Sequence, residues 1–248
     1  MARHDVMPYK KLTIQTQNRV GYLTMASGSR FNKLTINMLG ELRRAVAELA
    51  ANQQVSCIVL SGYPGESFAV GADIGQLRRF GPAEAFSFAE LGQGLFADME
   101  QCEKPIIGAL NGIAMGGGCD LALASDIRLA SDSLAIAHPG GKIGILTGFC
   151  GTQKLPRLVG RNNAREIFLT TDTYDASSAL RMGLVDRVVP AARFWPAVVA
   201  YAERIARQPL PALAAAKRLV NASQDVDLKN GCLLEHATVT ALAAVPTT

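Results

Sequence analysis

The feature that most constrains this chain is a run of three glycines between an apolar segment and a helical one. Residues 105–110 are short, apolar and bounded by turn-forming residues, which predicts a buried strand. Residues 116–118 are all glycine, and a helical pattern follows them. Glycine carries a high cost in backbone entropy. It is favoured where the backbone must approach another group closely, or where free N–H groups at a helix start face a ligand.

A glycine cluster alone is more typical of a tight structural turn, but a second stretch has the same design. Residues 67–74 read Ser-Phe-Ala-Val-Gly-Ala-Asp-Ile, so an apolar segment again leads through glycine into a predicted helix. Two such connections indicate that two parts of the backbone are shaped for one purpose.

Composition narrows the function classes. The 248 residues suffice for one large core, with 49% apolar and 19% charged residues, as in ordinary globular proteins. The net charge of +4 is too small to indicate nucleic-acid binding, but it is compatible with an anionic ligand such as a nucleotide phosphate. No apolar run has the length of a membrane span or of a signal peptide, so we expect no membrane association.

Cysteine and histidine spacing argues against a metal site. The five cysteines are scattered without a Cys-x-x-Cys pair, which predicts buried free thiols in a reducing, cytoplasmic compartment. His4, His138 and His236 have no metal-ligand spacing, and we expect a packing or surface role for His236.

Local patterns in the first half predict alternating strands and helices. A hairpin is expected over 11–17 and 20–25, with its turn at Asn18-Arg19. Thr35 is predicted to cap a helix with one apolar face, formed by Ile36, Leu39, Leu42, Val46 and Leu49. A buried strand is expected at 55–61 and a helix at 82–102, whose middle is weakened by Gly92 and Gly94.

The second half continues in the same way. Strands are predicted at 126–130, 133–137 and 185–189, and a loop at 138–144. Helices are predicted at 149–158 and 163–169, and another is opened by Asp175 and ended by Gly183. From 195 onward the chain is predicted to be helical, with breaks at Pro209 and Pro211.

The resulting class is α/β, without a composition shift that would mark an independent second domain. Other motif families fit poorly. The glycine run lacks the pattern of a dinucleotide fold, Gly140-Gly-Lys142 lacks the following Ser or Thr of a phosphate loop, and no Gly-x-Ser-x-Gly elbow occurs.

The two glycine-containing stretches, in this order and at this separation, resemble the enoyl-CoA hydratase/isomerase (crotonase) family. The resemblance extends from the first hairpin to about Glu235. It implies a spiral of ββα units over residues 1–190 and a C-terminal helical trimerisation region over 191–248. The implied assembly is a homotrimer or a dimer of trimers.

The resemblance also implies an oxyanion hole. The backbone N–H groups of Ala72 and Gly117 would hold the thioester carbonyl oxygen of an acyl-CoA, each donor contributing on the order of 3 kcal/mol to the barrier. The remaining residues that the resemblance assigns to CoA or substrate binding are Ser29, Arg30, Ala69, Val70, Gly71, Asp73, Ile74, Gly75 and Gly116. For Arg30, a solvated surface charge is an equally good interpretation.

The acid–base groups depart from the family pattern. Family hydratases carry two glutamates; the first position falls on Asp120 and the second on Gly140, which cannot transfer a proton. His138 lies two residues away and is a possible substitute, although a lone histidine is more often structural. Aspartate at position 120 also resembles the dienoyl-CoA isomerase branch, but the further aspartate of that branch falls on Gly148.

The run from Pro139 to Gly144 also resembles the naphthoyl-CoA synthase branch, in which some members use a bicarbonate ion in place of the carboxylate. Ile145 and Thr147 stand where that branch has polar catalytic groups. In the tail, Lys217, Arg218 and Lys229 are candidates to replace a basic residue that relatives place near the CoA phosphates, although a solvated helix face fits each of them better.

We therefore expect an acyl-CoA enzyme that needs no cofactor beyond its thioester substrate, with bicarbonate as an open possibility. Hydration of a 2-enoyl-CoA is the first hypothesis. An enoyl- or dienoyl-CoA isomerase that uses Asp120 as its sole acid–base group is the second. A catalytically degenerate acyl-CoA-binding subunit is the third.

Overall fold

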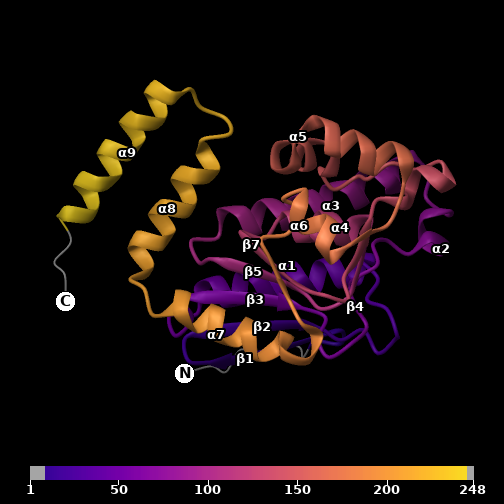
Figure 1. Cartoon of the computed structure of the whole chain (residues 1–248), viewed down its shortest axis with the longest axis horizontal. Helices are drawn as coiled ribbons and strands as arrows, with labels where there is room; N and C mark the ends of the chain where they lie inside the picture. Colours follow the sequence, from indigo (N-terminus) through magenta and orange to yellow (C-terminus); the bar gives the residue numbers. More distant parts are fainter. Residues whose placement is uncertain (1–8, 245–248) are drawn as a thin grey trace.

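The computed structural model describes residues 9–244. Two sheets form the body, with helices on both faces of the larger one (Figure 1). Residues 1–8 and 245–248, and with them His4, lie outside the described part. Within the described residues, no helix has the length and apolar character needed to cross a membrane.

The larger sheet has the order β1-β2-β3-β5-β7-β10. Its strands are β1 (Leu12–Gln17), β2 (Val20–Met25), β3 (Cys57–Ser61), β5 (Ile106–Leu110), β7 (Ile127–Ser131) and β10 (Arg187–Val189). The predicted hairpin is confirmed: β1 and β2 pair antiparallel, and Asn18 and Arg19 have φ of 50° and 64°, as a tight two-residue turn requires. The other neighbouring strands pair in parallel.

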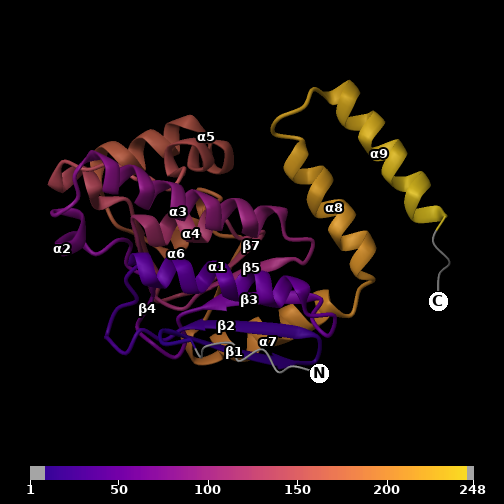
Figure 2. The same cartoon turned by 180° about the vertical axis from the view of Figure 1, so that it is seen from behind.

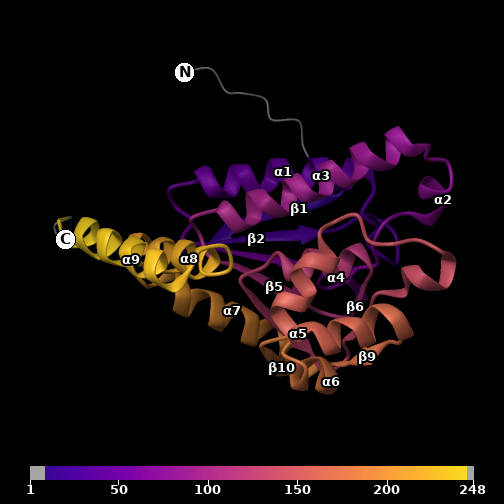
Figure 3. The ribbon, with the colours of Figure 1, turned by 90° about the horizontal axis from the view of Figure 1, so that it is seen from above.

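The two faces of this sheet bury alternate side chains. Leu23, Ile58 and Leu60 face the main core under α1 (Ile36–Ala51) and α3 (Pro82–Gln101). Their neighbours in sequence, such as Cys57 and Val59, face α7 (Phe194–Ala206) on the opposite side. Strands covered on both faces are continuously apolar, as the sequence of β3 and β5 is. Figure 3 shows the sheet between these two helical layers.

The smaller sheet has the order β4-β6-β8-β9 and carries the glycine-containing connections. Its strands are β4 (Ser67–Ala69), β6 (Ile113–Met115), β8 (Ala135–Ala137) and β9 (Tyr174–Asp175). The short helices α2 (Ile74–Leu77) and α4 (Gly117–Leu123) follow β4 and β6. Because β4 pairs in parallel with β6, both connections leave the sheet at the same edge.

The remaining helices are α5 (Gly151–Thr170), α6 (Ala176–Arg181), α8 (Leu210–Ala222) and α9 (Leu228–Ala243), with 3-10 turns η1 (Pro139–Ile143) and η2 (Ala191–Arg193). Seen from either side, α8 and α9 form a hairpin that projects away from the body (Figures 1 and 2). The caps predicted at Thr35 and Asp175 are confirmed, since their side chains accept from the backbone N–H of Met38 and Ser178.

Several local predictions need correction. Residues 138–144 do not form an open loop, because a 3-10 turn spans Pro139–Ile143 and ends at Gly144 with φ of 70°. Pro211 does not break a helix: it lies in the first turn of α8, where the missing N–H costs nothing. The prediction of two helical segments at 149–158 and 163–169 is confirmed, since the backbone of Gly160 within α5 is not helical (φ 78°, ψ 158°), but the first segment begins at Gly151 instead of Phe149.

Two side-chain predictions are also wrong. Ile36 is 43% exposed at the first turn of α1, apart from the buried face of that helix. Not all the thiols are buried: Cys57, Cys102 and Cys119 are, but Cys150 is half-buried and Cys232 is exposed. Cys232 lies on α9, whose only buried residue is Thr238, because this helix has little of its own chain to pack against.

Candidate functional site

The two glycine-containing connections lie against each other. A Cβ on Gly71 would be 2.7 Å from the carbonyl oxygen of Met115 and 3.0 Å from the backbone nitrogen of Gly117. A Cβ on Gly118 would collide with the carbonyl oxygen of Ala69. Gly71 also has φ of 78°, which other residues rarely adopt. The glycines are therefore required for close backbone contact beside Ala72.

Two N–H groups at this contact remain uncommitted. Among the described residues, neither Ala72 nor Gly117 donates its backbone N–H to any protein acceptor. Gly117 is the first residue of α4, where the N–H has no acceptor within the helix. The neighbouring N–H groups are used: Val70 donates to Asn32, and Gly116 donates to Ala137. Ala72, Gly116 and Gly117 are all half-buried, so a ligand can reach this edge.

Asp120 lies one turn into α4 and is fully buried. The hydroxyl of Thr147 donates to its Oδ2. Its Oδ1 lies against Gly151, where any side chain would collide with it, so the carboxylate is at the N-terminus of α5. The helix dipole favours a negative charge there.

His138 is the second titratable group beside this carboxylate. Its Nε2 lies 3.0 Å from Oδ1 of Asp120, with side-chain exposures of 4% and 0%. No hydrogen bond joins these two atoms, and the contact is an ion pair when the ring is protonated. Burial by itself lowers the pKa of His138, but Cys119 and Asp120 outweigh it and raise the pKa of His138 to about 10. The ring also packs on Phe168, with centroids 4.6 Å apart.

The position of the second family carboxylate is crowded. A Cβ on Gly140 would lie 2.7 Å from the carbonyl oxygen of Ile145 and 3.3 Å from its Cγ1. Within the described residues, no group of three or more His, Cys, Asp or Glu side chains is arranged to hold a metal ion.

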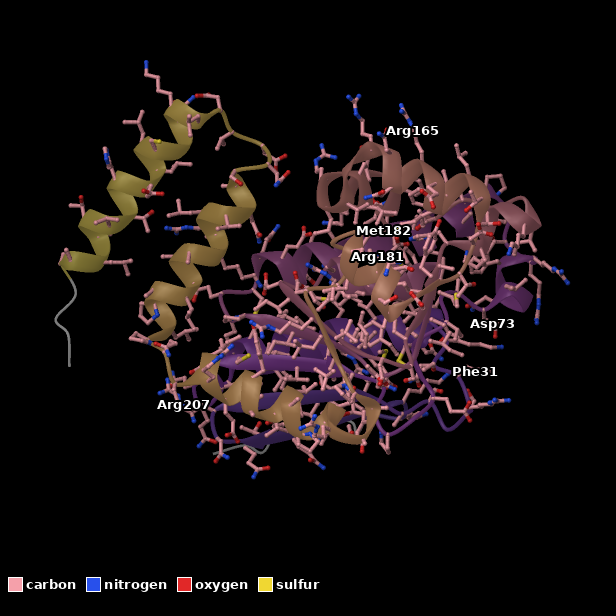
Figure 4. All side chains as sticks on the ribbon, in the orientation of Figure 1. Phe31, Asp73, Arg165, Arg181, Met182 and Arg207 are labelled. Carbon is pink, nitrogen blue, oxygen red and sulfur yellow. The ribbon has the colours of Figure 1, made fainter. Side chains whose placement is uncertain are left out.

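The predicted CoA-binding residues fall into two groups. Ala69, Val70, Gly71 and Gly116 lie at the glycine contact, and backbone hydrogen bonds tie the first three to Asn32 and Leu34. The others lie at the surface: Arg30 pairs with Glu66 at 2.9 Å, and the Ser29 hydroxyl donates to the carbonyl of Phe31. Figure 4 shows Phe31 and Asp73 at the same end of the body.

The side chain of Asp73 has a local structural role. It caps α2 by accepting from the N–H of Gly75 at 2.8 Å, and it pairs with Lys33 at 3.0 Å. These contacts lower the pKa of Asp73, with the Lys33 hydrogen bond as the largest cause. Ile74 is 46% exposed and contributes to a small hollow of about 120 Å³ with Leu77, Arg78, Ile143 and Ile145. A larger hollow of about 450 Å³ lies at the Gly160 bend and contains no residue of this site.

The three basic residues of the tail lie in different surroundings, and Lys217 is not on a solvated helix face. Lys217 is buried, 2.8 Å from Asp126, and donates to the carbonyls of Met99 and Lys104. Arg218 donates to Thr238 within the α8–α9 hairpin, and Lys229 is exposed on α9.

The sequence alone did not single out three residues of the site. Thr147 holds Asp120, Gly151 makes room for it, and Phe149 packs against Gly117. The contact of Phe149 had no local signal, since its partners are on α3 and α4.

Comparison with known proteins identifies the family of the chain. The chain is 34% identical over 229 residues to the crotonyl-CoA hydratase of Syntrophomonas wolfei, covering 92% of this chain and 88% of the relative. It is 31% identical over 229 residues to the short-chain-enoyl-CoA hydratase of Clostridium acetobutylicum, with the same coverage of 92% and 88%.

Solved structures agree in fold. The enoyl-CoA hydratase from Thermoplasma volcanium has a TM-score of 0.88 at 30% identity, covering 96% of this chain and 94% of that one. The enzyme from Bacillus anthracis has a TM-score of 0.90 at 28% identity, with coverage of 95% and 92%. The model of the enoyl-CoA hydratase/isomerase family matches residues 15–245. With this match and these relatives, the chain belongs to the enoyl-CoA hydratase/isomerase family and has the crotonase fold.

Proposed function

We propose that this protein is an enoyl-CoA hydratase that adds water to a 2-enoyl-CoA. The N–H groups of Ala72 and Gly117 hold the thioester carbonyl oxygen. The observation that carries the proposal is the close approach of the Gly71–Ala72 backbone to the start of α4, with both N–H groups uncommitted and a buried carboxylate one turn further on. Preorganised donors of this kind stabilise an enolate oxygen without reorganisation.

Asp120 is the acid–base group in this proposal. The water oxygen bonds to the β carbon while Asp120 accepts the water proton. The double bond shifts to the enolate, whose oxygen is held by the two N–H groups. Asp120 then returns the proton to the α carbon, so the enzyme ends unchanged. Thr147 and His138 hold the carboxylate in place from two sides.

Gly140 supports isomerisation as the second candidate. Moving a double bond needs one group that removes a proton from the γ carbon and returns it to the α carbon, and Asp120 alone can do both. The missing second carboxylate is tolerated better by this reaction than by hydration, in which a water must also be positioned.

Crotonyl-CoA and 3-enoyl-CoA substrates separate these functions. For hydration, wild type is expected to remove the absorbance of the conjugated thioester and to incorporate label from H₂¹⁸O, whereas Asp120→Asn loses at least about 100-fold in kcat. A positional isomer formed without label would support the isomerase instead. Tight CoA-thioester binding without turnover of either substrate would support a degenerate binding subunit.

We further propose that the thioester substrate is the only non-protein group required. The crowding of Gly140 by Ile145 supports this over a bicarbonate ion at that position. The rate in bicarbonate-free buffer is expected to stay constant as bicarbonate is added. A saturable rise would show that the ion takes part.

A homotrimer, or a dimer of trimers, is the proposed assembly, with no nucleic-acid partner. Several apolar side chains of α9 are exposed, such as Leu228 (84%), Leu233 (56%) and Val239 (59%). An exposed apolar helix face of this kind is typical of a protein–protein interface, which supports the proposed assembly. A cytoplasmic location is proposed from the free cysteines of the described chain.

A further inference from the structure

Phe149 occupies the space directly behind the proposed oxyanion donor. Its ring atoms Cε2 and Cδ2 lie 2.9 and 3.0 Å from the place that a Cβ on Gly117 would take. On the other side, a Cβ on Gly92 of α3 would collide with the same ring. The ring therefore fills the gap between the start of α4 and the middle of α3. Gly92, which weakens α3 as a helix former, is where α3 makes room for it.

The ring is held by its neighbours. Phe88 and Phe96 of α3 pack on it, with centroid distances of 5.1 and 5.7 Å. The backbone N–H of Phe149 donates to Thr147, whose hydroxyl donates to Asp120. Phe149 is only 3% exposed. Because these contacts hold Phe149 on several sides, its ring forms a rigid wall beside Gly117.

This wall limits where an acyl chain can go. A thioester carbonyl held by Gly117 places the following carbons next to α4, and the ring blocks the route between α3 and α4. The nearby hollow between α2 and η1, lined by Ile74, Leu77 and Ile145 among others, measures about 120 Å³. Pockets for drug-sized ligands measure roughly 300–1,000 Å³.

We propose that Phe149 is a specificity-determining residue that restricts this enzyme to short acyl groups of about four carbons. The proposal rests on the acyl-CoA function proposed above and adds the residue that sets the chain length. Removing the ring opens a space lined by Phe88, Phe96 and Leu34 that accepts a longer aliphatic chain.

The test measures binding of saturated acyl-CoA thioesters, which cannot react, by isothermal titration calorimetry. Acetyl-, butyryl-, hexanoyl-, octanoyl- and decanoyl-CoA are compared on wild type and on Phe149→Ala. For wild type, Kd is expected to stop improving beyond butyryl-CoA. For Phe149→Ala, the ratio of the butyryl-CoA Kd to the octanoyl-CoA Kd is expected to rise at least about tenfold, because each further buried CH₂ adds affinity.

Two further variants provide the controls. Phe194→Ala removes a phenylalanine that is equally buried but belongs to the separate cluster under α7, so it is expected to leave the chain-length profile unchanged. Phe149→Leu keeps most of the packing and is expected to show a smaller gain for octanoyl-CoA, which covers the case in which Phe149→Ala does not fold.

The outcomes are distinct. A wild-type Kd that keeps improving to decanoyl-CoA would overturn the inference, and so would an unchanged profile in folded Phe149→Ala or Phe149→Leu. Both results leave the hydratase proposal standing. Failure of wild type to bind acetyl- or butyryl-CoA at all would overturn the proposed function and this inference together.

Discussion

At the scale of single residues, the buried pair of Asp120 and His138 is the most consequential feature. Burying one charge is costly, whereas a paired and supported charge persists. The Asp120 carboxylate contacts three such groups: the Thr147 hydroxyl, the start of α5 and the His138 ring. The histidine is therefore a positioning residue for the proposed acid–base group.

The raised pKa of His138 predicts a pH-dependent contribution to stability. The unfolded pKa is about 6.5 and the folded pKa is about 10. The folded state holds a proton that the unfolded state releases, so the contribution is complete below pH 6.5 and is lost as pH rises through 10. The stability difference between wild type and His138→Gln is expected to shrink by at least about 1 kcal/mol between pH 6.5 and 10, measured by urea unfolding.

His138→Gln also serves as the comparison that removes the general effects of alkaline pH, since tyrosines and cysteines titrate in both proteins. A difference that stays constant, or grows, across that range would show that His138 is neutral in the folded protein. Asp120→Asn is expected to reduce the pH dependence without abolishing it, because Cys119, the largest of the causes that raise the His138 pKa, remains in place.

At the scale of elements, the parallel pairing of β4 with β6 brings the two glycine-containing connections together. Neither connection forms a site alone. Gly118 lets α4 approach the carbonyl of Ala69 so closely that a methyl group has no room. The spacing of the two N–H groups therefore depends on this contact.

Gly118→Ala is predicted to destabilise the protein by about 1–3 kcal/mol, through overpacking against β4. It is also expected to weaken turnover of crotonyl-CoA, because the two connections move apart. Gly40→Ala is the matched control: Gly40 is inside α1 with open space around it, and alanine there is expected to stabilise by about 0.5–1 kcal/mol. Urea unfolding and the crotonyl-CoA assay measure both effects. Equal stability of the two variants would mean that the connections are not in tight contact.

At the scale of the whole molecule, a partly buried ion pair fixes the α8–α9 hairpin to the body. Lys217 of α8 reaches Asp126, which precedes β7, and also donates to two backbone carbonyls. Burial raises the pKa of Asp126, and Lys217 opposes this effect. Asn221 of α8 adds a second contact with the body by donating to the carbonyl of Glu100, while α9 lies further out (Figure 2).

Lys217→Met is predicted to cost about 1–3 kcal/mol in unfolding free energy, since it leaves a half-buried carboxylate without its charged partner, although the Ile106 N–H still donates to that carboxylate. The double variant Lys217→Met/Asp126→Asn is expected to recover part of that loss. Lys229→Met, at an exposed lysine of α9, is expected to change stability by less than about 0.5 kcal/mol. A Lys217→Met variant as stable as the Lys229→Met control would show that the pair is not formed.

The apolar face of α9 predicts the effect of a charge placed there. Leu233→Glu puts a carboxylate on a helix face that the proposed trimer covers, so it is expected to shift the protein from trimer to monomer in light scattering coupled to size exclusion. Arg207→Glu, at the base of α8 and labelled in Figure 4, changes the charge outside that face and is expected to leave the trimer intact. A wild type that is monomeric at micromolar concentration would contradict the proposed assembly.

The sequence by itself determined the local structure and indicated where the backbone makes close contacts. The apolar runs of β3 and β5, the caps at Thr35 and Asp175, and the turn at Asn18-Arg19 depend on neighbours within a few residues, so they could be predicted. The glycines could be singled out for the same reason, because their cost in backbone freedom is visible in any sequence.

Only the tertiary structure decided which side chains meet. His138 beside Asp120, Ile145 over Gly140, Phe149 between Gly92 and Gly117, and Lys217 on Asp126 join segments that are 5 to 91 residues apart. Such contacts follow from sheet order and helix packing, which set charges and rings against each other without leaving a periodic signal in the sequence. For this reason the fold and the close-contact role of the glycines could be predicted from the sequence, whereas the partners of Asp120 and the wall behind Gly117 could not.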